Sequence, residues 1–348
     1  MSGALVHRVE ASGPGDVSGL SELIARGTLP DSVRAVIGKT EGNGCVNDFS
    51  RDLASRAWSD ALPKGAVTVM SGGTEGVLSP HFTLIAEHDS GSDSPSTLRV
   101  GVAVTDPIAP DELGRRAQVD AVAAAVTRAR HSADVDLHQV HFVLVKCPLL
   151  TSEAINATHR RGASVVCTGT YESMAHSRGA ASLGVALALE EIADDVIQAA
   201  LDGTVEAWSS VASASAGVEV RSCHVVLLGN AREHQRGQRI CSTVMRDAVD
   251  AASVQRLLDK IAADGGQVVQ VFAKAEADQT GTIRGRRHTM LTDSDVASTR
   301  HARAAVGGLL SGLTGDTALY VSGGAEHQGP AGGGPVAIVW EAGNGSDA

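Results

Sequence analysis

The stretch VRAVIGK at residues 33–39 is the first of three apolar runs that end in lysine, the others being HFVLVK at 141–146 and VVQVFAK at 268–274. Each run is rich in β-branched or aromatic residues, which predicts a buried strand. The strands would end at Lys39, Lys146 and Lys274. Because α/β proteins place their sites at the carboxyl ends of strands, these lysines mark where the chemistry is expected.

Three short segments alternate with the lysine runs along the chain. Each begins with serine and ends four positions later with glutamate: Ser71 to Glu75, Ser215 to Glu219, and Ser322 to Glu326. Two unrelated motifs that alternate three times without a miss predict three structural repeats with loops of unequal length.

Hydrophobic periodicity extends each repeat on both sides of its lysine run. The predicted helices cover residues 17–26, 118–130 and 254–263 before the runs and residues 48–60, 182–202 and 294–313 after them. The predicted opening strands cover residues 5–10, 98–104 and 224–228. We therefore predict an α/β fold of three β-α-β-α-β repeats around a pseudo-threefold axis, with unit A at 1–96, unit B at 97–220 and unit C at 221–348. The polar tract at 90–96 (SGSDSPS) is expected to be the loop between the first two units.

Composition excludes several function classes. The 348 residues carry a net charge of −11 and only three Trp, two Tyr and four Phe, so nucleic acid is not an expected partner. No apolar run approaches the length of a membrane span, so a membrane is not expected either. Five cysteines without a CxxC pair favour reduced thiols, and the start MSGALVHRVEAS lacks the pattern of a secretion signal. We expect a cytoplasmic protein.

The lysines and serines together indicate hydrolytic chemistry. If the repeats are related by a pseudo-threefold axis, three ammonium groups face one cavity, where repulsion and desolvation lower a lysine pKa toward neutrality. A serine beside a neutral lysine is an activated nucleophile, and Ser-Gly-Gly leaves backbone N–H groups free to bind an oxyanion. One such lysine alone would be read as a surface residue and one Ser-Gly-Gly as a turn, but the threefold recurrence favours a Ser–Lys hydrolase site.

One arginine per repeat completes the predicted site. Arg51, Arg178 and Arg303 each lie in or beside the helix that follows a lysine run, and they are expected to bind carbonyl oxygens in the same pocket. The usual rival motifs are missing: Gly38-Lys39-Thr40 lacks the first glycine of a P-loop, since position 33 is Val33. GxSxG, HExxH and a GxGxxG after a strand are also missing.

Four longer motifs resemble those of the cyanuric acid hydrolase/barbiturase family of ring-opening amidohydrolases. They are GKTEGNG at 38–44 with NDFSR at 47–51, MSGGTEGVLSPH at 70–81, VKCPLL at 145–150, and GRRHTM at 285–290. The resemblance covers essentially the whole chain. It implies a three-repeat fold around a pseudo-threefold axis, a central site of three Ser–Lys pairs, and hydrolysis without a catalytic metal.

The resemblance also implies individual roles. Lys146 would be the general base and Ser215 the nucleophile. The other residues expected to hold the substrate are Lys39, Lys274, Arg51, Ser71, Gly72, Arg178, Ala216, Arg303, Ser322 and Gly323. The second repeat departs from the others in having Ser-Ala-Gly instead of Ser-Gly-Gly, which is consistent with one pair being singled out for chemistry.

A structural divalent cation is a further implication of the resemblance. Its positions here would be Glu276, Ala325, Gln328, Gly329, Pro330 and Gly333. Glu276 supplies the only side-chain charge of this set, and the remaining ligands would be mostly backbone carbonyls, an oxygen set suited to Mg²⁺ or Ca²⁺.

Three functions are compatible with these residues. The first is cyanuric acid amidohydrolase, which forms carboxybiuret that decarboxylates to biuret, as in s-triazine degradation. The second is barbiturase, which opens barbituric acid to ureidomalonic acid. The third is a non-catalytic protein that binds a small metabolite, which the six intact Ser and Lys positions disfavour. The expected partner is a small cyclic amide, and the expected assembly is a homotetramer.

Overall fold

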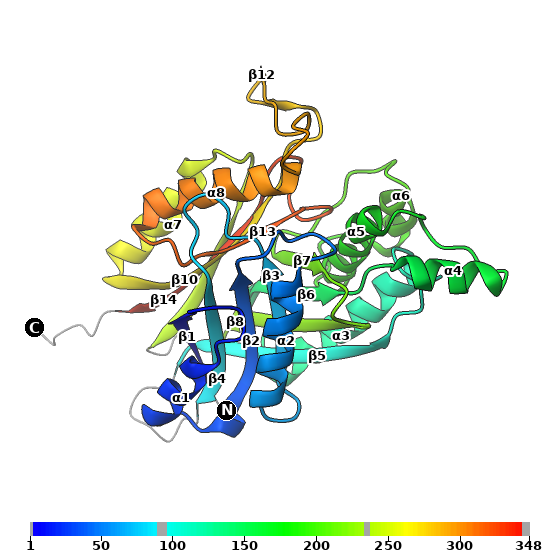
Figure 1. The fold of residues 1–348 in the computed structure, drawn as a ribbon. Coiled ribbons are helices and arrows are strands. Elements are labelled where there is room, and N and C mark those ends of the chain that lie inside the picture. The colour runs from blue at the N-terminus through cyan, green and yellow to red at the C-terminus, as the bar shows by residue number, and fades with distance from the viewer. Residues whose placement is uncertain (1–2, 89–95, 233–236, 343–348) are drawn as a thin grey trace, which may run out of the picture.

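The computed structural model describes residues 3–88, 96–232 and 237–342, and its elements fall into three consecutive groups (Figure 1). The first group contains β1 (Gly3–Glu10), α1 (Ser18–Ala25), η1 (Pro30–Ser32), β2 (Val33–Thr40), α2 (Phe49–Ala61), β3 (Val67–Gly72) and β4 (His81–His88). The second contains β5 (Leu98–Pro107), α3 (Arg116–Ala133), η2 (Leu137–Gln139), β6 (Val140–Cys147), α4 (Ser152–Arg160), α5 (Thr170–Ala188), η3 (Asp194–Val196), α6 (Ile197–Leu201), β7 (Ala212–Ala216) and β8 (Ser222–Asn230). The third contains β9 (Gln238–Met245), α7 (Ala251–Ala263), β10 (Gly266–Ala275), β11 (Thr282–Ile283), β12 (Arg286–Arg287), α8 (Ser298–Thr314), β13 (Tyr320–Gly323) and β14 (Gly334–Ala342).

Each group forms one four-stranded sheet, and the three sheets share a single strand order. That order is β1-β4-β2-β3 in the first, β5-β8-β6-β7 in the second and β9-β14-β10-β13 in the third. In every sheet the lysine strand pairs in parallel with the serine strand and antiparallel with the last strand of its group. The predicted α/β fold of three repeats is therefore confirmed, with a fourth strand in each repeat.

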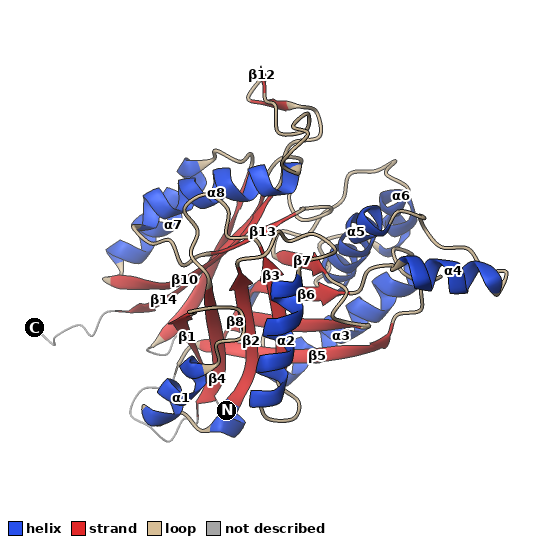
Figure 2. Ribbon diagram, viewed as in Figure 1, coloured by secondary structure: helices blue, strands red, loops and turns tan. Residues whose placement is uncertain are grey.

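The strand period of two explains how the sheets meet. Alternate residues of the lysine strands, such as Ile37, Leu144 and Phe272, belong to one core cluster shared by all three sheets. Their neighbours face outward into separate clusters with the helices of their own group. Figure 2 shows this arrangement, with the strands gathered in the middle and the helices around them.

The same alternation positions the predicted site. Two residues beyond Ile37, Leu144 and Phe272 along each strand come the three lysines, which therefore lie at one end of the shared core. Because β3, β7 and β13 run parallel to the lysine strands, their serines reach the same end.

Two sequence predictions need correction. The strand predicted to open the third repeat, residues 224–228, is β8, which pairs with β5 and β6. The unit boundary predicted at residue 220 therefore falls ahead of the second sheet's last strand instead of behind it. The fourth strand at the end of each repeat was not predicted, and this omission shifted the boundary.

The second correction concerns the helix predicted at 182–202. The structure has α5 from Thr170 to Ala188 and the short α6 from Ile197 to Leu201. Small residues fill α5, and it is buried on almost all sides, so its amphipathic period is weak in the sequence. The loop predicted at 90–96 lies largely outside the described residues. Among the described residues, no helix is long and apolar enough to cross a membrane.

Candidate active site

The three Ser–Lys pairs are formed by strand register. In the parallel ladders, Lys39 lies opposite Ser71, Lys146 opposite Ser215, and Lys274 opposite Ser322. All six side chains are buried. The spacing of the two motifs along the chain thus becomes three equivalent pairs at the centre of the molecule.

Each lysine amine lies in a nearly anhydrous setting. Lys146 Nζ donates to the carbonyl of Met70 at 2.7 Å, and Lys274 Nζ donates to the carbonyl of Ala214 at 2.7 Å, each in the preceding repeat. Lys274 Nζ also reaches Ser322 Oγ at 3.1 Å, whereas Lys39 Nζ donates to the carbonyl of Gly72 at 3.3 Å. The bonds to Met70 and Ala214 join neighbouring sheets, whereas the bonds to Ser322 and Gly72 lie within one sheet.

Burial lowers the pKa of all three lysines, but not equally. The pKa values of Lys39 and Lys274 fall well below the usual range because of burial and of nearby guanidinium groups. Burial also lowers the pKa of Lys146, but the carboxylate of Glu219 counteracts part of this effect. The pKa of Lys146 is therefore lowered less than those of Lys39 and Lys274, although the three strands are equivalent.

The three arginines pair with glutamates across the repeat boundaries. Arg178 of the second repeat donates to both oxygens of Glu326 in the third, at 2.7 and 2.6 Å. Arg303 of the third repeat donates to both oxygens of Glu75 in the first, at 2.7 and 2.6 Å. Bidentate pairs of this kind fix both the position and the plane of a guanidinium.

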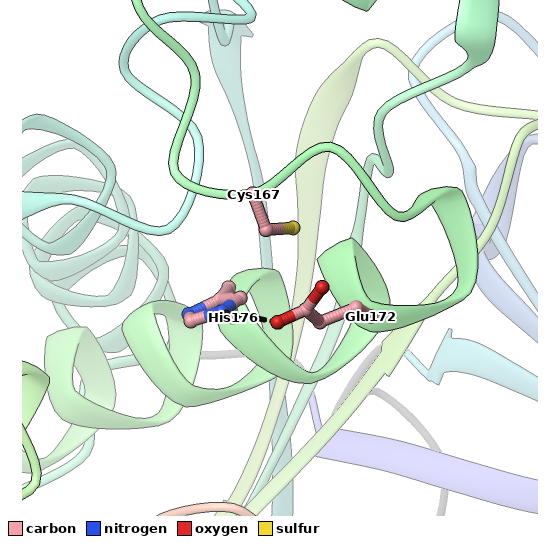
Figure 3. A group of neighbouring side chains, drawn as sticks. All are labelled: Cys167, Glu172 and His176. Atoms are coloured by element: carbon pink, nitrogen blue, oxygen red, sulfur yellow. Dashed lines mark ion pairs between the residues drawn. The ribbon is translucent and has the colours of Figure 1, made fainter.

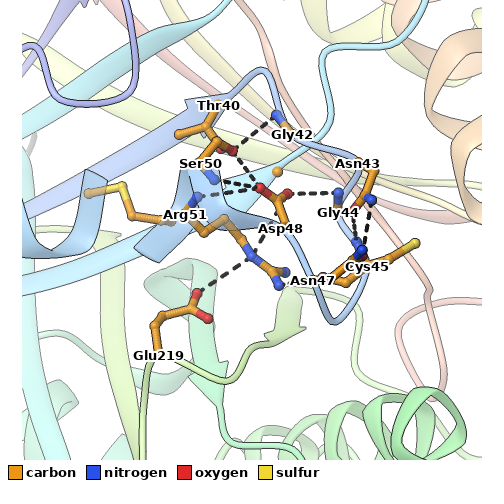
Figure 4. Close-up of polar contacts among 12 residues, drawn as sticks. Thr40, Gly42, Asn43, Gly44, Cys45, Asn47, Asp48, Ser50, Arg51 and Glu219 are labelled. Atoms are coloured by element: carbon orange, nitrogen blue, oxygen red, sulfur yellow. Dashed lines mark hydrogen bonds and ion pairs between the residues drawn. The ribbon is translucent and has the colours of Figure 1, made fainter. Parts of the chain in front are cut away.

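The remaining arginine makes a looser pair. Arg51 Nε lies 3.7 Å from Glu219, and this carboxylate is instead 2.7 Å from Lys146 Nζ. Arg51 is held by backbone carbonyls, which accept from it at Cys45 and Ala216. Figure 4 shows Arg51 between Glu219 and the side chain of Asp48.

Asp48 explains why the loop after β2 takes this shape. It is the N-cap of α2, where its carboxylate accepts from the backbone N–H groups of Ser50 and Arg51, and it also accepts from Gly44 N at 2.8 Å (Figure 4). A Cβ on Gly72 would lie 1.6 Å from this carboxylate, so position 72 requires glycine.

The residue after the ladder serine differs between repeats. In the third repeat, a Cβ on Gly323 would meet Arg303 at 2.7 Å. The second repeat has Ala216 at this position, and the backbone carbonyl of Ala216 accepts from Arg51 of the first repeat at 3.3 Å.

A small cavity lies where the three serines meet. The sequence-predicted residues lining it are Arg51, Ser71, Gly72, Arg178, Ser215, Ala216, Arg303, Ser322 and Gly323. The three predicted lysines do not line it but lie behind the serines, as the ladder pairing shows. The structure thus brings the predicted catalytic and substrate-binding residues together.

Three further residues belong to the site and were missed. Gly44 and Met174 line the cavity. Gly44 lies inside the GKTEGNG motif, and Met174 precedes Arg178 by one helical turn, so the spacing could have indicated both. Tyr320 is buried two residues before Ser322 on β13, and its ring centroid is 5.9 Å from Lys39 Nζ. Burial raises the pKa of Tyr320 to about 12, while the three site serines act to lower it.

Ser215 differs from the serine of the third repeat. Its hydroxyl is buried and makes no hydrogen bond to the lysine of its own repeat, whereas the Ser322 hydroxyl contacts Lys274.

Glu276 satisfies the main requirement of the implied cation site. Burial, together with the charge of Glu326, raises the pKa of Glu276 to about 7, and no basic side chain of the described residues forms an ion pair with it. Its carboxylate accepts only from Gly332 N, at 3.3 Å. The side chain of Gln328 is already hydrogen-bonded to the backbone, so residue 328 would contribute a carbonyl. A half-buried carboxylate beside a turn-rich segment fits a hard cation.

A second group of metal-ligand types lies away from the cavity. The ligand atoms of Cys167, Glu172 and His176 are all within 4.8 Å of one another (Figure 3). The helical period places Glu172 and His176 on the face of α5 opposite Met174 and Arg178. Burial, with Glu172 beside it, raises the pKa of the Cys167 thiol, which disfavours the thiolate that a metal requires. This group has no part in the site.

Comparison with known proteins gives consistent matches over the whole length. The family described as "Amidohydrolase ring-opening protein" matches residues 5–341. A cyanuric acid amidohydrolase of Pseudonocardia dioxanivorans is 54% identical over 336 residues, which cover 97% of both chains. Another, from a Rhodococcus species, is 50% identical and covers 98% of this chain and 96% of its own.

Solved structures agree with these relatives. The structure published under the words "Cyanuric acid hydrolase: evolutionary innovation by structural concatenation" superimposes with a TM-score of 0.93 at 45% identity, covering 98% of this chain and all of the other. A crystal structure of the cyanuric acid hydrolase from A. caulinodans gives a TM-score of 0.92 at 44% identity, covering 99% of this chain and 100% of the other.

Proposed function

The chain belongs to the family of ring-opening amidohydrolases, enzymes that act on the C–N bonds of cyclic amides, and on that premise we propose that its substrate is cyanuric acid. The observation that carries this proposal is the threefold arrangement of serines, lysines and arginines around one small cavity. Relatives about half identical over their full length carry the same name, which supports the choice.

The symmetry of the cavity matches the symmetry of this ring. Cyanuric acid has three equivalent carbonyls and three ring N–H groups, so each carbonyl edge can meet one serine and one arginine. Ser71, backed by Lys39, and Ser322, backed by Lys274, would hold two edges while the third reacts. Holding the ring at all three edges orients one carbonyl for attack and lowers the entropic part of the barrier.

We assign the chemical steps to the second repeat. Ser215 Oγ attacks a ring carbonyl while Lys146 Nζ accepts its proton, and the arginines stabilise the oxyanion that forms. Collapse of this intermediate breaks the ring C–N bond, and Lys146 returns the proton to the departing nitrogen. Water then hydrolyses the acyl-enzyme to release carboxybiuret, which loses CO₂ to give biuret.

Turnover of two purified heterocycles tests the substrate. We expect the protein to convert cyanuric acid to biuret, detected by mass spectrometry, and to leave barbituric acid much less affected. Barbituric acid has CH₂ in place of one ring N–H, which leaves a polar group of the site without its partner. Faster opening of barbituric acid would identify a barbiturase. Tight binding of cyanuric acid without turnover would identify a binding protein instead.

We also propose that a structural Mg²⁺ or Ca²⁺ is held by Glu276 and by backbone carbonyls of Ala325, Gln328, Gly329, Pro330 and Gly333. This segment follows directly on Ser322, so a cation there would brace the loop that carries Glu326 toward Arg178. None of the steps assigned above involves it, because Ser215, Lys146 and the arginines supply the nucleophile, the base and the cationic groups.

Removal of this cation is expected to lower the stability of the fold more than the rate of turnover. At a hundredfold excess over its dissociation constant a bound ion contributes about 2.7 kcal/mol to stability, so a chelator should lower the melting temperature. Mg²⁺ or Ca²⁺ should restore it, and Glu276→Gln should already melt low and not respond to the chelator. We expect residual turnover that Zn²⁺ does not enhance. Complete, reversible loss of activity at an unchanged melting temperature would instead indicate a catalytic metal.

The assembly and the compartment are also proposals. We propose a homotetramer in the cytoplasm, as the family resemblance implies. Light scattering during size-exclusion chromatography would measure the mass of the assembly. Cell fractionation would show the compartment in which the protein lies.

A further inference from the structure

The second repeat breaks a pattern that the other two keep. Glu75 and Glu326 have both carboxylate oxygens occupied by the fork of an arginine. Neither forms an ion pair with a lysine among the described residues. Glu219 occupies the same place in its repeat, but its nearest cation is Lys146 Nζ at 2.7 Å. One of three otherwise equivalent lysines therefore has a carboxylate partner.

Burial makes this partnership significant. The side chains of Lys146 and Glu219 are only 1% and 3% exposed, so the pair is largely shielded from bulk solvent. In such a setting the energy of an ion pair approaches that of the neutral amine and carboxylic acid. A proton can then pass along the contact without crossing solvent.

We propose that Glu219 is the proton acceptor that selects the second Ser–Lys pair for catalysis: it holds Lys146 as an ammonium in the resting enzyme and takes its proton when the ring substrate binds. This inference rests on the proposed function and goes beyond it, since it explains why Lys146, and not Lys39 or Lys274, acts as the base. Glu75 and Glu326 cannot do the same because their oxygens are already bound to arginine.

The proton balance closes over one turnover. An Nζ–H bond of Lys146 breaks as an O–H bond of Glu219 forms, which leaves a neutral amine beside Ser215. The amine takes the Ser215 proton as the Oγ–C bond forms, and it gives that proton to the ring nitrogen as the C–N bond breaks. In the second half of the reaction, the amine takes a proton from the attacking water and gives it to Ser215 Oγ as the acyl bond breaks. After product leaves, Glu219 returns its proton to Lys146.

Other charged or titratable groups around Lys146 do not offer this route. Arg51 on α2 is a cation, which lowers the pKa of Lys146. The thiol of the adjacent Cys147 is kept protonated, since burial raises its pKa. His224 on β8 lies opposite Lys146 in the ladder, but its Nδ1 lies 3.4 Å from the carbonyl of Thr68, and burial lowers its pKa and so makes it a weaker base than an ordinary histidine. Glu219 is thus the carboxylate in contact with the amine.

The pH dependence of turnover in Glu219→Gln shows whether Glu219 accepts a proton from Lys146 or acts only as a nearby negative charge. In the wild type, proton transfer within the pair leaves its total number of protons unchanged. Turnover should therefore stay constant as the pH is lowered, until Glu219 itself is protonated. Burial alone would raise the pKa of Glu219, but Lys146 and Arg51 hold it below its usual value. The acid limb of the profile, which is the fall of kcat/KM on the acidic side, should therefore lie at low pH.

In Glu219→Gln, Lys146 must lose its proton to solvent. We expect kcat at the acidic end of the range to fall by about 10²-fold, as for loss of a positioned proton acceptor, and to recover as the pH rises through the pKa of Lys146. The acid limb thus moves to higher pH. A carboxylate that acted only as a neighbouring charge would give the opposite shift, because its removal lowers the pKa of Lys146.

Two variants complete the experiment. Glu75→Gln is the matched control: it loosens Arg303 and should raise KM while leaving the acid limb in place. Glu219→Asp keeps a carboxylate and should keep the wild-type limb at reduced kcat, which separates proton transfer from failure to fold. If the wild type turns over cyanuric acid but the acid limb of Glu219→Gln lies at the same pH as in the wild type or at a lower pH, the inference about Glu219 is wrong and the proposed function still stands. Absence of wild-type turnover overturns the proposed function and this inference together.

Discussion

Ser215→Ala is expected to lower kcat for ring opening by at least about 10³-fold, which corresponds to about 4 kcal/mol of transition-state stabilisation. The loss is this large because no other group can form the bond to the ring carbonyl. The fold should survive, since the Ser215 hydroxyl lies on the cavity wall and has no hydrogen-bond partner within the described chain. Steady-state kinetics and the melting temperature of the same sample measure both effects.

The other two repeats supply matched controls for this variant. Ser71→Ala and Ser322→Ala remove the same hydroxyl from equivalent ladder positions, and we expect them to raise KM and to retain measurable turnover. A serine-trapping inhibitor should label Ser215. Labelling of Ser71 or Ser322, or more than a tenth of the wild-type rate in Ser215→Ala, would place the nucleophile in another repeat.

Lys146→Ala is expected to match the loss in Ser215→Ala, because the two residues act as one unit. The double variant should then be hardly slower than either single variant. If the loss of kcat in the double variant equals the product of the two single losses, Lys146 acts independently of Ser215.

The sequence was sufficient to locate the site because two periodicities coincide in it. The period of two along each strand puts Lys146 on the core face together with Leu144, and parallel pairing places Ser215 opposite it. Both facts depend on local sequence and on one recurring motif. The predicted lysines, serines and arginines therefore lie together in the structure.

The different partners of the three glutamates could not be predicted, because they depend on contacts between repeats. Nothing in the spacing of Ser215 and Glu219 indicates that Glu219 would approach Lys146 while Glu75 and Glu326 bind arginine. That difference is a matter of a few ångströms in how neighbouring sheets meet. The assignment of β8 to the wrong unit has a similar origin, because a strand's sequence does not state which sheet it joins.

Lys39→Met is expected to stabilise the folded protein near neutral pH. Burial and the nearby Arg303 hold the pKa of Lys39 well below its usual 10.5, so the amine binds a proton less readily in the fold than in the unfolded chain. The unfolded state then binds more protons, and the free energy of unfolding rises with pH up to about 10.5. Methionine fills similar space without this penalty, so the variant should melt higher.

The pH dependence tests the cause of that gain. Between the folded pKa of Lys39 and 10.5, the wild-type free energy of unfolding should rise more steeply with pH than that of Lys39→Met, by up to about 1.4 kcal/mol per pH unit. Denaturant unfolding at several pH values measures the two slopes. Lys146→Met is the informative contrast: it leaves Glu219 buried without its nearest cation, which costs about 3 kcal/mol, so this variant should be less stable than the wild type. Equal slopes in the wild type and Lys39→Met would show that Lys39 keeps its proton in the folded protein.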